Sequence, residues 1–394
     1  MSAATEDGGK KIPIEQPLAG LVAIEIGHSV AAPFGGHVLA SLGATLIKVE
    51  NPGKGDDARG WGPPFWHGAS ACFQSLNRDK LSITVDLKDE NQRAELMALI
   101  VDRADIVVQN LRPGLIEKFG LEARQLRAQK PSLIYCNMGA FGTTGPLRER
   151  PGYDPLMQAF GGIMSITGED GRAPVRVGPS LIDIGTGMWA VIGILAALRR
   201  REITGEGCEI DTSLLETAMA WMTIPAALYL ASGEPQGRTG SEAAMVVPYK
   251  AFRASDDFLV ITAGNDNLFR RLCAAMERPD WAEDSRFRTN ADRIVNRTLL
   301  NQMIEDVIGQ HDRAYWSERL ETAGVPCAPL QSIDEVLAHP QAKALGMLQP
   351  DPNSDMQLMG LPLSFDAHRP PFLHSPPTLG QHTDEIFPAR ARRE

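Results

Sequence analysis

The sequence predicts an α/β protein with a doubly wound, Rossmann-like large domain and a smaller α+β domain. Between residues 21 and 150, strand-like apolar segments alternate with helix-like segments, and this alternation is typical of a parallel sheet covered by helices. The pattern changes at a Gly-, Pro- and Arg-containing linker, residues 232–240. A chain of 394 residues is also longer than one ordinary core requires, so we expect two domains.

The elements of the large domain follow from apolar periodicity and from turn residues. Strands are predicted at residues 21–26, 44–50, 105–109 and 132–136, and helices at 34–42 (directly after Pro33), 91–102 and 121–129. A Gly-, Asp- and Pro-rich loop covers residues 51–68. Two long apolar helices, 184–200 and 213–229, are predicted on either side of a turn at 205–207.

The smaller domain begins with two strand-like segments, 247–252 and 258–262, which the polar turn 254–257 would join as an antiparallel pair. Helices are predicted at about 267–277, 298–309 and 313–323. From residue 346 the chain is Pro-rich with little helical periodicity, so we expect this tail to wrap over another element.

Composition argues against several classes of protein. A formal net charge of −10 disfavours nucleic-acid binding. The polar N-terminus is unlike a signal peptide, and the most apolar segment, 182–198, contains an aspartate, so we expect no membrane span. The five cysteines include no CxxC pair, and His28, His37 and His67 lack supporting acidic or cysteine ligands. We therefore expect a cytoplasmic protein without a bound metal.

Asp183 is the strongest catalytic candidate, because it lies where an apolar run passes into a hydrophobic helix. The unpaired amides and the positive dipole end of a helix N-terminus would favour its ionised form. Gly185 and Gly187 would let a bulky substrate approach. The alternative is an aspartate that only caps the helix, which is common in proteins.

Arg112 indicates a phosphate-bearing ligand, because it follows the predicted strand 105–109. Ligands of α/β folds bind at the carboxyl ends of the strands, and a guanidinium suits phosphate. Glu50 could hold a ribose, but the turn 27–36 lacks the GxGxxG pattern, and no Walker A motif is present, so we do not expect NAD. The other loop cations are interpreted singly as solvated surface charges: Lys54, Arg59, Arg78, Lys80, Lys88 and Lys118.

The chain resembles the family III CoA-transferases, also called the CaiB/BaiF family, in segments that follow one another in unbroken order from about residue 17 to 386. These segments are 31–33 (AAP), 42–50 (LGATLIKVE), 55–59 (GDDAR), 77–80 (NRDK), 105–114 with its RPG turn, 152–154 (GYD) through 158–159, 183–187 (DIGTG), 264–269 (GNDNLF) and 379–383 (LGQHT). No single motif carries the resemblance.

The resemblance implies an interlocked, ring-like homodimer. Its subunit would have a disordered tail (1–16), a large CoA-binding domain (17–228), a small domain (229–330), and a linker with a C-terminal segment that returns to the large domain (331–394). The resemblance also implies that Asp183 attacks an acyl-CoA thioester. An aspartyl anhydride and then an aspartyl-CoA thioester would form, from which a free carboxylic acid takes the CoA, without a permanently bound cofactor.

The CoA contacts also carry over by position. The resemblance assigns them to Ser29, Val30, Ala31, Asn51, Val85, Lys88, Asn110, Leu111, Arg112, Lys118, Tyr153 and Asp154. Asn51 is a departure, because formyl-CoA transferase has an arginine near the adenine at this position. Arg59 or Arg78 would then substitute for it.

Three related activities remain to be distinguished. The 2-methylacyl-CoA racemases carry a histidine where this chain has Tyr153, and a glutamate where it has Asp266. A phenol, with a pKa of about 10, is a poor base, so transfer is favoured. The loop 238–248 lacks the glycine run of formyl-CoA:oxalate enzymes.

Segments 55–65 and 247–252 look closer to transferases that use succinyl-CoA or a related dicarboxylyl-CoA. Arg238 is a candidate for holding a distal carboxylate, and a linker surface charge is the alternative. A non-catalytic CoA-binding module is the alternative from another class of function.

Overall fold

The computed structural model describes residues 12–388, which form two compact units. The first unit comprises the described chain up to Ile163, residues Arg176–Ile224, and the described chain from Gln341. The second unit comprises Met164–Val175 and Pro225–Pro340. Of the predicted N-terminal tail, residues 1–11 lie outside the described residues, and residues 13–16 form a turn closed by a 2.9 Å hydrogen bond.

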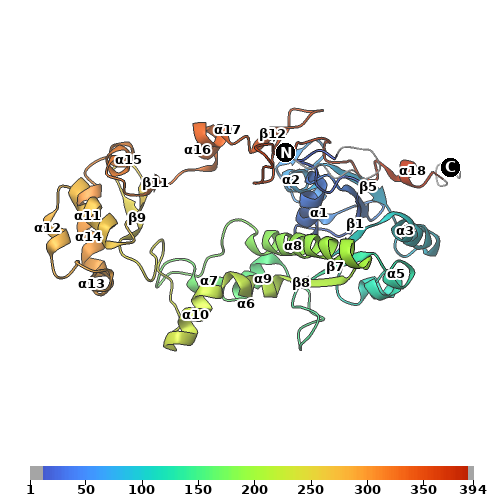
Figure 1. Ribbon diagram of the computed structural model, residues 1–394, viewed down its shortest axis with the longest axis horizontal. Coiled ribbons are helices and arrows are strands. Elements are labelled where there is room, and N and C mark those ends of the chain that lie inside the picture. Colours follow the sequence, from blue (N-terminus) through green and yellow to red (C-terminus); the bar gives the residue numbers. More distant parts are fainter. Residues whose placement is uncertain (1–11, 389–394) are drawn as a thin grey trace. The chain divides into compact units, whose positions relative to one another are not determined.

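A six-stranded parallel sheet forms the centre of the first unit (Figure 1). Its strand order is β5-β2-β1-β6-β7-β8, with every neighbouring pair parallel. This is the doubly wound order, which reverses direction between β1 and β6. The predicted α/β class with a parallel sheet is confirmed. The strands are β1 (Val22–Ile26), β2 (Thr45–Glu50), β5 (Lys80–Thr84), β6 (Ile106–Gln109), β7 (Ile134–Gly139) and β8 (Glu209–Ser213).

Apolar side chains of the central strands are buried on both faces of the sheet. Ala23 and Ile106 belong to one core cluster, which also contains residues of helices α1 (Ala31–Ser41) and α8 (Leu181–Thr204). Their neighbours Ile24 and Val107 belong to a second cluster, shared with α3 (Glu90–Arg103) and α5 (Ala123–Gln129). Within residues 12–388, α8 is long and apolar enough to cross a membrane, and the consecutive helices α9 (Leu214–Trp221) and α10 (Thr223–Ser232) would qualify if taken as one bent span.

Three of the differences between the structure and the predicted elements concern the sheet and the helices that pack on it. The edge strands β5 and β8 were not predicted, because edge strands are often polar and these carry few apolar residues. Helix α1 begins at Ala31 rather than after Pro33, since the first turn of a helix tolerates proline. The predicted helix 213–229 is two helices, α9 (Leu214–Trp221) and α10 (Thr223–Ser232). Pro225 lacks the amide that would continue α9.

The C-terminal segment lies along the β5 edge of the sheet. The His382 amide donates to the Ser82 carbonyl (2.9 Å), and the Thr84 amide donates to Thr383 Oγ1 (3.0 Å). The tail therefore wraps over another element, as predicted, and that element is β5. It covers a sheet edge that would otherwise be open to pairing with another strand. The remaining elements of this unit are 3-10 helix η1 (Asp57–Gly60), β3 (Phe65–Trp66), β4 (Ala69–Ser70), α2 (Ala71–Asn77), α4 (Leu115–Lys118), α6 (Asp154–Phe160), β12 (Leu348–Pro350), β13 (Gln357–Met359) and α18 (Thr383–Ile386).

The second unit contains a three-stranded sheet of order β11-β10-β9. Strands β9 and β10 pair antiparallel, with Phe258 opposite Arg253, as predicted. The predicted helices are present as α11 (Asp266–Ala275), α14 (Arg297–Ile308) and α15 (Arg313–Thr322). The elements are β9 (Tyr249–Arg253), β10 (Phe258–Thr262), α11 (Asp266–Ala275), α12 (Asp280–Glu283), α13 (Asn290–Val295), α14 (Arg297–Ile308), α15 (Arg313–Thr322), β11 (Cys327–Pro329) and α16 (Ile333–Ala338). Helices α7 (Ile163–Ile166) and α17 (Pro340–Ala344) lie at the boundaries between the units.

Candidate active site

The loops after β1 and β6 are joined by a reciprocal pair of hydrogen bonds. The His28 amide donates to Asn110 Oδ1 (3.0 Å), and Asn110 Nδ2 donates to the His28 carbonyl (2.9 Å). These loops lie at the carboxyl ends of the two strands between which the sheet order reverses. Doubly wound folds bind their ligands in the crevice at this point, so this is where we expect a ligand.

Two adjoining cavities open at this point. The first contains Asp183, and the second, of about 390 Å³, lies over the ends of β2 and β5. His28, Leu111, Arg112 and Tyr153 line both cavities, so together they form one continuous site. The first cavity is also lined by Ser29, Ala31, Asn110, Met138 and Gly152, and the second by Glu50, Asn51, Lys54, Val85 and Lys88.

Most of the sequence-predicted contacts therefore lie around this site, and three do not line it. Val30 is buried directly before α1. Lys118 ends the short helix α4, and Asp154 is only 3% exposed. Sequence reasoning missed His28, which lines both cavities, although its position directly after the first strand is a signal that could have identified it.

The cavity cations differ in whether a protein carboxylate already pairs with them. Lys54 Nζ lies 2.9 Å from Asp57 Oδ1. Lys88 and Arg112 line the larger cavity, and no side chain in residues 12–388 forms an ion pair with either. These two cations are therefore the ones available to an anionic ligand.

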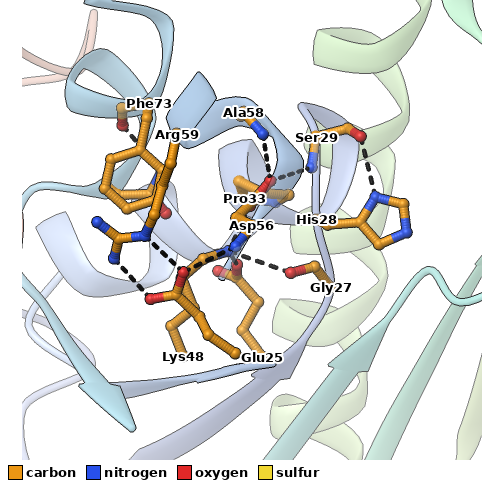
Figure 2. A network of polar contacts seen from close by, with 12 residues as sticks. Glu25, Gly27, His28, Ser29, Pro33, Lys48, Asp56, Ala58, Arg59 and Phe73 are labelled. Atoms are coloured by element: carbon orange, nitrogen blue, oxygen red, sulfur yellow. Dashed lines mark hydrogen bonds and ion pairs between the residues drawn. The ribbon is translucent and has the colours of Figure 1, made fainter. Parts of the chain in front are cut away.

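A buried ionic network holds the loop after β1 (Figure 2). Lys48 Nζ lies 2.6 Å from Glu25 Oε1 and 2.9 Å from Asp56 Oδ2, and all three side chains are fully buried. Asp56 Oδ1 accepts hydrogen bonds from the amides of Ser29 and Ala58, both at 2.9 Å. Ser29 has a left-handed backbone, with φ of 71°, which a non-glycine residue adopts only where its surroundings enforce it. The network therefore sets the shape of the cavity wall.

Electrostatics keep this network ionised. Burial would raise the pKa of Asp56, but the charge and hydrogen bond of Lys48 outweigh it and hold that pKa below its usual value. His28 precedes Ser29, with its Nδ1 2.9 Å from Ser29 Oγ, and burial lowers the pKa of His28 although the charges of Asp56 and Asp57 oppose this shift. We therefore expect a neutral imidazole at the junction of the two cavities at pH 7.

Glu50, Arg59 and Arg78 make contacts within the protein. Arg59 donates to both oxygens of Glu50 (2.7 and 2.6 Å), and its guanidinium stacks 3.8 Å from the centre of the Phe73 ring. Arg78 is fully buried, with its guanidinium 4.6 Å from the Phe372 ring. These contacts do not favour the hypotheses that Glu50 holds a ribose and that Arg59 or Arg78 reaches an adenine, because Glu50 is paired with Arg59 and neither arginine lines either cavity.

Asp183 is not the cap of α8. The helix begins at Leu181, so Asp183 is its third residue. The amides of Ile182 and Asp183 donate to Asp154 Oδ2 at 2.7 and 3.2 Å. Within residues 12–388, no group donates a hydrogen bond to the Asp183 carboxylate. The capping role belongs to Asp154, and the alternative interpretation of Asp183 is wrong.

The ionisation of Asp183 also differs from the prediction. Burial and then the charge of Asp154 raise the pKa of Asp183 to about 7. The prediction that helix amides favour the ionised form is wrong, because Asp154 has taken those amides. The same carboxylate therefore exists in both protonation states near neutral pH.

The two glycines after Asp183 serve helix packing. A Cβ on Gly187 would lie 2.8 Å from the Ala31 carbonyl oxygen, and one on Gly185 would lie 2.9 Å from the Trp221 ring. Side chains cannot be accommodated at such distances without movement of α1 or α9. These glycines therefore allow α8 to pack closely against α1 and α9, and this packing explains them in place of the predicted approach of a substrate.

Potential metal ligands do not gather in this part of the chain. In residues 12–388, no group of three or more His, Cys, Asp or Glu side chains is placed to hold a metal ion. All five cysteines, at positions 72, 136, 208, 273 and 327, are free thiols.

Comparison with known proteins identifies the family. The family model described as CoA-transferase family III matches residues 18–383. The chain belongs to CoA-transferase family III. The resemblance inferred from the motifs is confirmed, and the protein is an enzyme of this CoA-transferase family.

Relatives and solved structures of family III cover nearly the whole chain. The chain is 36% identical over 380 residues to a succinate–glutarate CoA-transferase of Agrobacterium fabrum, covering 94% of this chain and 95% of the relative. It is 38% identical over 333 residues to an acetyl-CoA:oxalate CoA-transferase of Acetobacter aceti, with 84% and 85% covered. A CAIB/BAIF family protein from Brucella suis is similar in structure, with a TM-score of 0.85 and 37% identity over 96% of this chain and 100% of that chain.

Proposed function

We propose that this family III enzyme transfers CoA from an acyl-CoA to a free carboxylic acid, with Asp183 as the nucleophile. The observation that carries the proposal is that Asp183 and Arg112 line one cavity at the reversal point of the sheet. This cavity adjoins a larger one with the unpaired cation Lys88. The larger cavity suits the phosphates of CoA, and the smaller one suits the thioester.

The chemistry begins with the Asp183 carboxylate, which attacks the thioester carbonyl and displaces the CoA thiolate. The mixed anhydride that forms is attacked by this thiolate at the aspartyl carbonyl, which releases the donor acid and leaves an aspartyl-CoA thioester. The acceptor carboxylate then attacks this thioester, and the reverse sequence regenerates Asp183. One thioester replaces another, so no ATP is consumed. Because the nucleophile must be ionised, a pKa of about 7 places its working range at and above neutral pH.

Succinyl-CoA or a related dicarboxylyl-CoA is the proposed donor. The Agrobacterium relative is named a succinate–glutarate CoA-transferase, and a 35% identical mouse relative is named a succinyl-CoA:glutarate CoA-transferase. The racemase alternative is disfavoured, because the cavity residue at position 153, where the racemases carry a histidine, is a tyrosine. Its second expected base, Asp266, lies 2.8 Å from Arg293 in an ion pair. The formyl-CoA:oxalate alternative is likewise not favoured by the loop 238–248.

A homodimer is proposed as the working form, in the cytoplasm. One face of α8 leaves apolar side chains 40–51% exposed at a spacing of three to four residues: Met188, Ile192 and Leu195. Such a stripe on a helix is typical of a surface that another protein covers. Light scattering of the purified protein should give twice the chain mass of 42.8 kDa, and a monomer would contradict this part of the proposal.

The test of the activity is an exchange assay. Purified protein is mixed with succinyl-CoA and, separately, with glutarate, other dicarboxylates, oxalate and monocarboxylates, and new CoA thioesters are separated by chromatography. We expect exchange with dicarboxylates that is lost in Asp183→Ala. No exchange with any acid, or exchange that survives Asp183→Ala, would overturn the proposal.

A further inference from the structure

We propose that Asp154 is a positioning residue for Asp183: its buried carboxylate holds the start of α8 and thereby leaves the Asp183 carboxylate free to face the cavity. This inference rests on the proposed function of Asp183 as the nucleophile. It assigns to Asp154 a role different from the CoA contact that the resemblance implies.

The geometry at the start of α8 supports this role. Ser180 precedes the helix but makes no capping hydrogen bond with its side chain. Asp154, the first residue of α6 and only 3% exposed, supplies the cap from a distance of 28 residues along the chain. Its Oδ2 accepts from the Ile182 and Asp183 amides, and its Oδ1 accepts from Gln158 Nε2 (2.6 Å). Both oxygens act only as acceptors, as expected for an ionised carboxylate.

Gln158 extends these hydrogen-bonded contacts from the start of α8 to the segment before the helix. Gln158 is fully buried one turn along α6, and its Oε1 accepts a hydrogen bond from the Val177 amide (2.8 Å). Helix α6 thus holds the chain at two points, at Val177 and at the first turn of α8. The backbone that carries Asp183 is therefore held both in the segment before the helix and at the first turn of the helix, and the Asp183 side chain does not have to contribute a hydrogen bond.

Asp154 also sets the charge environment of Asp183. The groups that face Asp183 are Asp154 from α6, Cys72 from α2, and His28, Arg112 and Tyr153 around the cavity. Burial raises the pKa of the Cys72 thiol, and the charges of Asp56 and Asp183 add to this effect, so Cys72 is neutral at pH 7. The negative charge next to Asp183 is then that of Asp154, and it raises the pKa of Asp183.

The decisive experiment compares pH profiles of two conservative variants. Asp154→Asn keeps an acceptor for the α8 amides but removes the charge. We expect the acid limb of kcat/KM for CoA exchange to move to lower pH by about one unit. Asp154→Glu keeps the charge but displaces the cap. We expect its acid limb to stay in place while kcat falls by about 10- to 100-fold at little-changed KM for the acyl-CoA.

Asp351→Asn is the matched control. Asp351 is a similarly buried carboxylate, 5% exposed, that accepts hydrogen bonds from Asn353 and Ser375 in the C-terminal segment. It lines neither cavity, so its variant should keep the wild-type acid limb and kcat. A shift in this control equal to that of Asp154→Asn would overturn the inference.

The outcomes separate this inference from the proposed function. If the wild-type protein exchanges no CoA, the proposed function fails. If the wild type is active and both Asp154 variants keep its acid limb and its kcat, the positioning role is wrong. If circular dichroism shows that Asp154→Asn is unfolded, Gln158→Leu takes its place. This variant removes the Nε2 donor that lies 2.6 Å from Asp154 Oδ1 and changes neither carboxylate. A lower kcat at unchanged KM in that variant supports the role, and an unchanged kcat overturns it.

Discussion

Replacing Lys48 by methionine should lower the free energy of unfolding by about 3–5 kcal/mol at pH 7, the typical cost of leaving a buried charge without its partner. Lys48 is fully buried between Glu25 and Asp56, at 2.6 and 2.9 Å. Glu25 keeps a second cation, Lys80, at 2.7 Å. Asp56 has no other cation within ion-pair distance in residues 12–388, so the cost is concentrated on Asp56.

The loss of unfolding free energy should depend on pH, in a direction that follows from the pKa shift of Asp56. In the wild type the folded pKa of Asp56 is depressed, so the pair stabilises fully above the unfolded pKa of about 3.9 and is lost as pH falls through the folded value. Without Lys48, burial raises the pKa of Asp56 above the unfolded value. Protonation then relieves the buried charge, and the difference from wild type should be smaller at pH 5 than at pH 7.

Urea unfolding followed by circular dichroism at both pH values measures this difference. Lys54→Met is the control, because Lys54 pairs with Asp57 at the surface, with the side chains 74% and 50% exposed, and such pairs contribute little. A loss below about 1 kcal/mol for Lys48→Met at pH 7, or a loss that does not shrink at pH 5, would refute the reasoning.

Three further outcomes are expected. Wild-type kcat/KM should fall about tenfold per pH unit below pH 7, because only ionised Asp183 attacks; a flat profile between pH 5 and 7 would contradict this. Arg112→Ala should raise the KM for acyl-CoA about 10-fold or more, whereas Lys118→Ala, outside both cavities, should leave it nearly unchanged; equal effects in a steady-state assay would refute this placement. Gly187→Ala should destabilise by about 1–3 kcal/mol, since its Cβ would lie 2.8 Å from the Ala31 carbonyl oxygen; an unchanged urea midpoint would show that α1 and α8 separate freely.

The elements predicted well from sequence are those whose side chains repeat a simple pattern. Strands β1, β2 and β6 are short apolar runs buried on both faces, so the pattern identified them within a residue. Strands β5 and β8 could not be found in the same way. They lie at the two edges of the sheet, where pairing with a neighbouring strand and, for β5, cover from the C-terminal segment decide the conformation, and neither has a local sequence signal.

The site shows the same division between local and long-range information. Arg112 was placed near a ligand because its position after a strand is a local property, and the structure places it in both cavities. The ionisation of Asp183 was predicted in the wrong direction, because it depends on Asp154, which is distant in sequence and takes the amides of α8. Arg59 looked like a loop cation for the same reason, since its partner Glu50 is reached only in the folded chain.

The most direct test of the central claim is the covalent state of Asp183 during turnover. The protein is mixed with succinyl-CoA, quenched with acid and digested, and peptides are analysed by mass spectrometry. We predict a CoA adduct on the peptide that contains Asp183, formed by the wild type and by Lys118→Ala and absent from Asp183→Ala. CoA exchange that proceeds with no adduct on this peptide, or with the adduct on Cys72, would contradict the account.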